Sequence, residues 1–140
     1  MSGTLYVVPN LLGAIAPEAV LPSRTIEIAR TLSHWIVETP KPARAFLKSI
    51  GTSRPIGEVS IASLSADAAS GVAAALAALA AGHDVGLLSD AGCPGVADPG
   101  ADVVRAAHAA RVHVVPLVGP SAILLALMAS GMNGQHFAFH

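Results

Sequence analysis

Short apolar runs alternate along the chain with longer stretches that have helical spacing. Strands of a parallel sheet are covered on both faces, so their sequences are continuously apolar rather than alternating. The apolar runs predict strands at residues 5–8, 35–37, 58–62, 85–88, 112–117 and 137–139. Apolar residues three and four positions apart predict helices between them, at residues 24–32, 41–50, 67–81, 102–110 and 120–130. This alternation predicts an α/β domain: a mostly parallel sheet flanked by helices on both faces.

Residues that commonly begin and end helices stand at several of these boundaries. Ser23 is a candidate N-cap for the first helix, and Pro120 suits the first turn of the last helix. Glycine, which tolerates the left-handed backbone after a helix, follows three of the predicted helices, at Gly51, Gly82 and Gly131. These helices are therefore expected to end at defined positions, with short connections to the strands that follow.

The composition is strongly apolar without indicating a membrane protein. Hydrophobic residues make up 53% of the 140 positions and charged residues only 12%, which excludes an intrinsically disordered chain. The longest uninterrupted apolar run covers residues 72–81, about half of the ~20 residues that a transmembrane helix needs. The first residues lack the basic segment of a secretory signal, so we expect a cytoplasmic protein with no membrane partner.

Charge and cysteine content limit the kinds of partner further. The net charge is −1, from 8 lysines and arginines against 9 aspartates and glutamates. Nucleic acid could therefore be bound only through a local basic patch. Cys93 is the single cysteine, which excludes an internal disulfide and a cysteine-based zinc site. The histidines share no ligand spacing on a predicted element, and no metal is expected.

The predicted helix 41–50 carries one local basic patch. Lys41, Arg44 and Lys48 lie three and four positions apart, so they share one face of the helix. The apolar residues of the same segment occupy the other face. Two interpretations are open: an ordinary solvated helix face, or a stripe that contacts the phosphates of a substrate.

Loops rich in glycine, proline and polar residues follow the predicted strands. Ligands of open parallel sheets bind at this carboxyl edge. Glycines in the loop 89–100 allow close backbone approach to a ligand, and its prolines hold it rigid. The alternative is a rigid turn in which Asp98 caps the next helix. The turn 119–122 opens a helix and fits either anion binding or ordinary capping. No dinucleotide or nucleoside-triphosphate glycine motif is present.

Three segments together resemble the tetrapyrrole methylase superfamily of S-adenosyl-L-methionine-dependent methyltransferases. The most specific is Ser89-Asp90-Ala91-Gly92-x-Pro94-x-x-x-Asp98-Pro99-Gly100, and it is supported by Leu5-Tyr6-Val7-Val8-Pro9 and by Gly119-Pro120-Ser121-Ala122. Order and spacing are most similar to the branch that methylates the 2′-oxygen of cytidine in small-subunit ribosomal RNA. The resemblance spans essentially all 140 residues.

The resemblance implies a fold, a cofactor and a set of contacts. Members usually have two α/β domains with S-adenosylmethionine between them, and many are homodimers. Residues 1–140 would be the N-terminal domain, with the C-terminal domain missing and the isolated chain inactive. Ribosomal RNA would be the partner, contacted by the stripe Lys41, Arg44 and Lys48. The residues implied in cofactor binding are Pro9, Asp90, Ala91, Gly92, Val96, Asp98, Ser121 and Ala122.

The sequence also departs from the branch where the substrate is expected. Glu38-Thr39-Pro40-Lys41 keeps an acidic and a basic residue after the second strand but lacks the Asp and Thr of the branch. Glu38 is the candidate general base for a ribose hydroxyl, because it stands at a strand end beside the expected cleft. Two alternatives remain: a methyltransferase of the same family that acts on a tetrapyrrole or another small acceptor, and a truncated, non-catalytic module for cofactor binding or dimerisation.

Overall fold

Five parallel strands form the sheet of the computed structural model, which describes residues 1–140. The strands are β1 (Thr4–Val8), β2 (His34–Val37), β3 (Ser60–Ser63), β4 (Val85–Leu88) and β5 (His113–Pro116). Their order across the sheet is β3-β2-β4-β1-β5, so β1 and β4 lie side by side near the centre. The predicted parallel sheet is thus confirmed, with its carboxyl ends at one edge, but only the central strand β4 is buried throughout, and β3 and β5 at the two sides are partly exposed.

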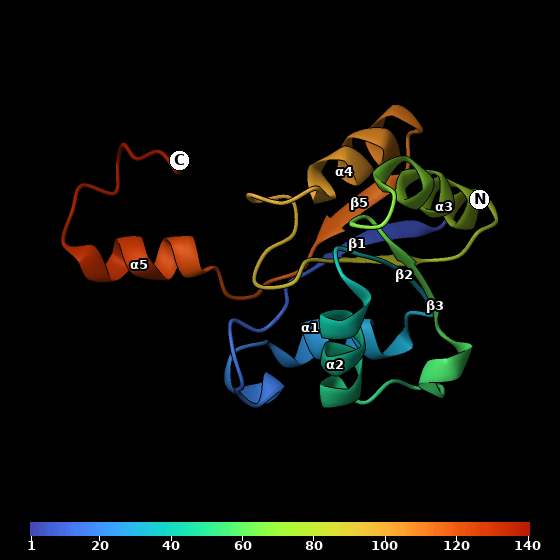
Figure 1. The fold of residues 1–140 in the computed structure, drawn as a ribbon, viewed down its shortest axis with the longest axis horizontal. Helices are drawn as coiled ribbons and strands as arrows, with labels where there is room; N and C mark the ends of the chain where they lie inside the picture. The colour runs from blue at the N-terminus through green and yellow to red at the C-terminus, as the bar shows by residue number, and fades with distance from the viewer.

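Two helices cover each face of the sheet, as Figure 1 shows. The helices α1 (Ser23–Thr31) and α2 (Pro40–Ile50) lie on one face, and α3 (Ala68–Ala80) and α4 (Gly100–Ala109) lie on the other. The predicted α/β layering with helices on both faces is confirmed. None of the helices is long and apolar enough to cross a membrane.

The two apolar layers differ in the size of their side chains. The layer under α1 and α2 contains Trp35, whose ring lies edge-on to Phe46 at a centroid distance of 6.3 Å. Gly86 is the partner of Trp35 on the neighbouring strand, and a Cβ there would lie 2.6 Å from the indole ring. The layer under α3 and α4 has no buried aromatic residue; the two helices contribute Ala75 and Ala107 to it, among leucine, isoleucine and valine side chains. Alanine therefore allows α3 and α4 to pack closely on the sheet.

Several element boundaries differ from those predicted. The strand expected at 58–62 is β3, and the residues before it form a short 3-10 helix, Ile56–Glu58. Ser23 was expected to be an N-cap, but it is the first residue of α1. Pro22 precedes it and no side chain caps the helix. The helix α4 begins at Gly100 rather than 102, because the Asp98 carboxylate accepts the Gly100 N–H.

The C-terminal segment leaves the body of the domain (Figure 1). The helix α5 (Ala122–Ser130) begins after Ser121, which caps it, so Pro120 lies before the helix rather than in its first turn. The strand predicted at 137–139 is wrong, because these residues fold back against α5 and pair with no strand. No residue of α5 is buried, although the helix is apolar on all sides.

Candidate functional site

Asn10 links the loop after β1 to the loop after β4. Its side chain is buried, and its amide nitrogen donates to the carbonyl oxygens of Ser89 (2.9 Å) and Asp90 (3.3 Å). Its backbone N–H donates to the carbonyl of Gly92 at 2.9 Å. The hydroxyl of Ser89 is also within hydrogen-bond distance of the carbonyls of Ala91 and Gly92, at 3.1 and 3.2 Å. The turn at Asp90–Gly92 is therefore held through its backbone carbonyls by the polar groups of Asn10 and Ser89.

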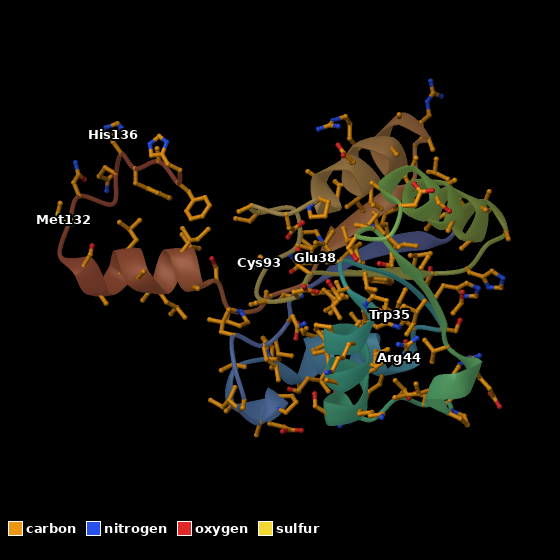
Figure 2. All side chains as sticks on the ribbon, in the orientation of Figure 1. Trp35, Glu38, Arg44, Cys93, Met132 and His136 are labelled. Atoms are coloured by element: carbon orange, nitrogen blue, oxygen red, sulfur yellow. The ribbon has the colours of Figure 1, made fainter.

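The loops after β2 and β4 are joined by side chains of both. The Asp90 N–H donates to Glu38 Oε2 at 2.8 Å. In return, the Asp90 carboxylate accepts the Thr39 N–H at 3.1 Å and the Thr39 hydroxyl at 2.8 Å. Figure 2 shows Glu38 at this edge of the sheet. Both acidic side chains thus connect one loop to the other.

The loop after β5 packs against the loops after β1 and β4. A Cβ at Gly119 would lie 2.2 Å from Cβ of Pro9, so only glycine allows this approach. Gly92 has a φ of +66°, and a Cβ there would lie 3.5 Å from the Pro120 carbonyl oxygen. The Cys93 thiol lies 3.4 Å from the same oxygen and donates to it, and burial raises the pKa of this thiol. Cys93 is therefore a packing residue of this contact.

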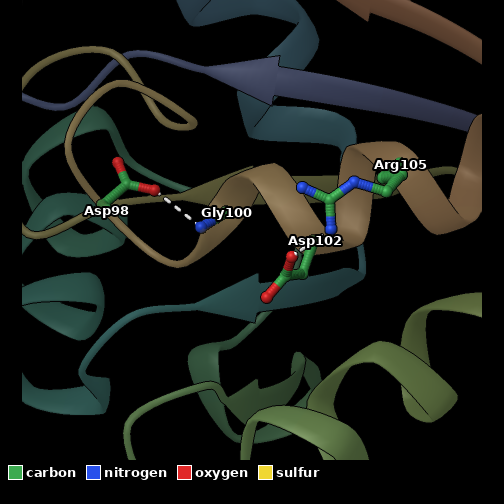
Figure 3. Close-up of polar contacts among 4 residues, drawn as sticks. All are labelled: Asp98, Gly100, Asp102 and Arg105. Atoms are coloured by element: carbon green, nitrogen blue, oxygen red, sulfur yellow. Dashed lines mark hydrogen bonds and ion pairs between the residues drawn. The ribbon is translucent and has the colours of Figure 1, made fainter.

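Asp98 organises the second half of the loop 89–100. Its Oδ1 accepts the N–H of Gly95 at 2.9 Å and of Gly100 at 2.7 Å; Figure 3 shows the second of these bonds. Asp98 therefore joins the turn at Gly95 to the first residue of α4, although Pro99 holds the N-cap position and no side chain caps the helix. Between the two donors, Ala97 adopts a left-handed backbone with φ of +59°. The Asp102–Arg105 ion pair in Figure 3 is exposed on α4.

Most of the residues expected to bind cofactor surround one small hollow. The hollow has a volume of about 100 Å³ and is lined by Leu12, Ala91, Gly92, Cys93, Val96, Ser121, Ala122 and Ile123. Of the predicted set, Pro9, Asp90 and Asp98 do not line it. Pro9 is buried beneath Gly119, while Asp90 and Asp98 shape the loop through the bonds described above. The structure brings the loops after β4 and β5 together, as their positions in the sequence predict.

Three larger hollows share lining residues with the small one. One, of about 450 Å³, lies between α5 and residues 137–139 and shares Ala122 and Ile123. Leu12 also lines a hollow of about 380 Å³ between the loop after β1 and helix α2, which includes Asn10 and Asp90. Val96 also lines a hollow of about 440 Å³ over β5 and α4. Ligand pockets commonly have roughly 300–1,000 Å³, so the small hollow alone has room for only part of a ligand of ordinary size.

The basic stripe lies beside this region and not in it. Lys41, Arg44 and Lys48 are exposed on α2, and none of them forms an ion pair. Figure 2 shows the position of Arg44 on the helix. The α2 residues that line the 380 Å³ hollow are Pro42, Ala45, Phe46 and Ser49. The common exposed face predicted for the three cations is confirmed, with the hollow on a neighbouring face.

Sequence reasoning missed Asn10 and Thr39 as site residues. Each stands two residues after a predicted apolar strand, 5–8 or 35–37, which was the available signal. Their partners in the loop 89–100 could be identified only once the order β2-β4-β1 was known. Leu12 and Ile123 were missed because apolar lining residues look like core residues in the sequence.

Comparison with known proteins gives relatives over nearly the whole chain. No family model matches. The ribosomal RNA small subunit methyltransferase I of Xylella fastidiosa (strain Temecula1) is 34% identical over 137 residues, which is 98% of this chain and 48% of that protein. The proteins of the same name from Synechocystis and Escherichia coli O157:H7 are 29% and 30% identical, each over 98% of this chain. The chain spans about half the length of the curated relatives it matches.

Proposed function

Because the chain is a divergent member of the ribosomal RNA small subunit methyltransferase I family, within the tetrapyrrole methylases, we propose that it forms the cofactor-binding domain of an RNA methyltransferase. One observation carries the proposal beyond the relatives' names. The residues expected to touch S-adenosylmethionine from the loops after β4 and β5 line a common hollow at the carboxyl edge of the sheet. Open parallel sheets bind their ligands at this edge.

The residues present fit such a cofactor. Gly92 keeps the hollow open, because a Cβ there would lie 3.3 Å from the Leu12 side chain on the opposite wall. We propose that Ala91, Gly92, Val96, Ser121 and Ala122 hold the cofactor, while Pro9, Asp90 and Asp98 support the loops that carry them. The cofactor supplies a methyl group on a sulfonium. The protein's own contribution is to position cofactor and acceptor in line.

The acceptor we propose is RNA, bound in part by the stripe on α2. Lys41, Arg44 and Lys48 are exposed cations without a carboxylate partner, so they are free to contact phosphates. The overall charge of −1 gives no general attraction for nucleic acid, which makes a local stripe necessary.

The relatives are about twice as long as this chain, so we propose that residues 1–140 act together with further protein. We infer that methyl transfer needs this second part, because the hollow at the sheet edge is open to solvent on the remaining sides. The exposed apolar residues of α5, such as Leu124, Leu125 and Met128, are candidates for burial against it or in a homodimer.

Calorimetry on the 140-residue chain tests the cofactor site. We expect micromolar binding of S-adenosylmethionine and S-adenosylhomocysteine, with no heat from NAD or ATP. Gly92→Ala is expected to weaken binding at least tenfold. Gly51→Ala is the matched control, because Gly51 also has a positive φ (+72°) but has open space around it. Both variants lose about 1 kcal/mol of stability. A folded chain that binds neither cofactor form overturns the proposal.

Binding to fragments of small-subunit ribosomal RNA tests the acceptor class. Replacing Lys41, Arg44 and Lys48 together by alanine should weaken RNA binding. It should also reduce the slope of log K against log salt by about 2, since each phosphate contact in single strands contributes ~0.7. Arg105→Ala, an exposed cation on α4, is the control. Equal salt slopes for the triple variant and the parent chain would exclude the stripe and favour a small-molecule acceptor.

A further inference from the structure

Glu38 and Asp90 form a reciprocal connection at the point where β2 and β4 end. The ladder between these strands finishes with the Glu38 N–H, which donates to the Leu88 carbonyl at 3.0 Å. Beyond it, side chains continue the pairing: Glu38 Oε2 accepts the Asp90 N–H, and both oxygens of Asp90 accept from Thr39. The connection therefore joins the two segments one residue beyond β2 and two residues beyond β4, next to the residues that line the hollow.

Glu38 is itself fixed from the opposite side. Its carbonyl oxygen accepts the Ser65 N–H and the Ser63 hydroxyl, both at 3.1 Å. These two residues belong to β3 and the turn after it, on the far side of β2 from β4. The Glu38 backbone is thus hydrogen-bonded on both sides, to β4 and to β3 with its following turn. These bonds fix the position from which the Glu38 side chain extends to the loop after β4.

The loop that Glu38 holds is the wall of the hollow. Asp90 is followed by Ala91 and Gly92, which line the hollow directly. Asn10 holds the carbonyls of the same turn from β1. The Asp90 N–H is therefore the backbone group through which Glu38 holds this wall, beside the two bonds from Thr39 to the Asp90 carboxylate.

We propose that Glu38 is a positioning residue that fixes the cofactor-binding turn Asp90–Gly92, in place of the general-base role expected from its sequence position. This inference rests on the proposed function and deepens it. A base must hold a lone pair toward the acceptor's hydroxyl. Glu38 Oε2 instead accepts a backbone N–H of its own chain at 2.8 Å, a bond that directs the carboxylate toward the loop after β4, while Oε1 has no hydrogen-bond partner. Both carboxylate oxygens of Asp90 accept hydrogen bonds from Thr39, which fixes the same turn to the loop after β2.

Substitutions separate the two roles. Glu38→Gln keeps an oxygen that can accept the Asp90 N–H but has no basicity, whereas Glu38→Ala removes the acceptor. Positioning therefore predicts that Gln preserves the turn and Ala releases it. A general base predicts that both variants bind cofactor like the parent chain and that both lose turnover by roughly 10²–10⁴-fold.

The test measures S-adenosylhomocysteine binding and amide hydrogen exchange in the 140-residue chain. We expect Glu38→Ala to weaken binding at least fivefold and to speed exchange of the Asp90 amide at least tenfold. Glu38→Gln should stay within twofold of the parent chain in both. Thr39→Val should weaken binding and speed exchange of the Asp90 amide, in both cases by less than Glu38→Ala. Thr39→Ser keeps the hydroxyl and should match the parent chain in both. Glu58→Ala, an exposed glutamate of the 3-10 helix Ile56–Glu58, is the control.

The outcomes are distinguishable. If the parent chain folds but does not bind S-adenosylhomocysteine, the proposed function fails, and the exchange data still decide whether Glu38 fixes the turn. If the parent chain binds and Glu38→Ala matches it in affinity and in Asp90 exchange, the positioning role is wrong. The positioning role is also wrong if Glu38→Gln loses as much affinity and exchange protection as Glu38→Ala, because the hydrogen-bond acceptor at this position then makes no difference.

Discussion

The two ends of the sheet are connected in different ways. At the carboxyl end, side chains of one loop hold the backbone of another, as Asn10 holds Ser89 and Glu38 holds Asp90. At the amino end, most bonds are local helix endings, such as the His83 N–H to the Ala78 carbonyl. Side-chain bonds between loops thus gather at the carboxyl end of the five strands, while the amino end has fewer of them, such as the Thr4 N–H to Asp84 Oδ1. We infer that the first end carries the function.

The largest expected effects come from glycines packed against backbone or proline at each end. A Cβ at Gly3 would lie 1.9 Å from the His83 carbonyl oxygen, and one at Gly119 would lie 2.2 Å from Cβ of Pro9. Each Gly→Ala change should cost about 3 kcal/mol of unfolding free energy, at the upper end of overpacking costs. Urea denaturation measures this cost. Only Gly119→Ala should also weaken S-adenosylhomocysteine binding at temperatures where both variants are folded.

Gly13→Ala is the control for this pair, since nothing lies within 4 Å of the position that its Cβ would take. The contrast between the two ends would be refuted by a Gly3→Ala variant that is folded and loses cofactor affinity as strongly as Gly119→Ala does.

The sequence predicted the elements of both ends better than their connections. Apolar runs located β1 and β4, and Asp67 and Gly82 marked the limits of α3, because these signals act within a few residues. The pairing of Glu38 with Asp90 depends on strand order, which no local pattern contains. The error at 137–139 has the same cause: an apolar run becomes a strand only where a neighbouring strand is within reach.

The residues that line the hollow could be predicted from the sequence to a similar extent. Ala91 and Ser121 stand far apart in the sequence but line one hollow, as the motif resemblance implied. Asn10 could not be found in this way, because its importance lies in being buried against carbonyls of a loop about 80 residues later.

Removal of a cross-loop polar side chain should cost more at the carboxyl end than at the amino end. Asn10→Ala leaves the buried carbonyls of Ser89 and Asp90 without this donor, which should cost about 2 kcal/mol. Asp84→Ala removes only an exposed acceptor of the Thr4 N–H, which water can replace, so we expect about 0.5 kcal/mol. Urea denaturation of both variants measures the difference. Equal losses would mean that burial at Asn10 does not determine the cost.

Each end also contains a left-handed residue that is not glycine. Arg111, in the turn before β5, has φ of +58°, and Ala97, in the loop before α4, has φ of +59°. Arg111→Gly should stabilise the domain by about 0.5–1 kcal/mol, because glycine adopts this backbone without strain.

Ala97→Gly relieves similar strain but loosens the loop that carries Val96, so cofactor affinity should fall two- to threefold. Thermal denaturation and calorimetry give the two quantities; unchanged affinity in Ala97→Gly would show that this half of the loop does not preorganise the site.

The smallest effect is a pH dependence at the amino end. The rings of His34 and His83 stack at 4.2 Å, and Ser33 Oγ lies 2.9 Å from His34 Nδ1. Burial first, and then the charges of His83 and Arg54, lower the pKa of His34 below its ordinary value of about 6.5. The unfolded chain therefore binds this proton more readily, so the contribution of His34 to stability is complete above pH ~6.5 and is lost as the pH falls toward the lowered pKa.

The fall in unfolding free energy from pH 7.5 to 5.0 should shrink in His34→Gln and, by less, in His83→Gln, while His136→Gln in the C-terminal segment leaves it unchanged. Cofactor affinity should follow none of these changes, because the histidines lie at the opposite end of β2 and β4 from the hollow. A pH profile that is the same in His34→Gln and in the parent chain would remove the stacked pair as its source.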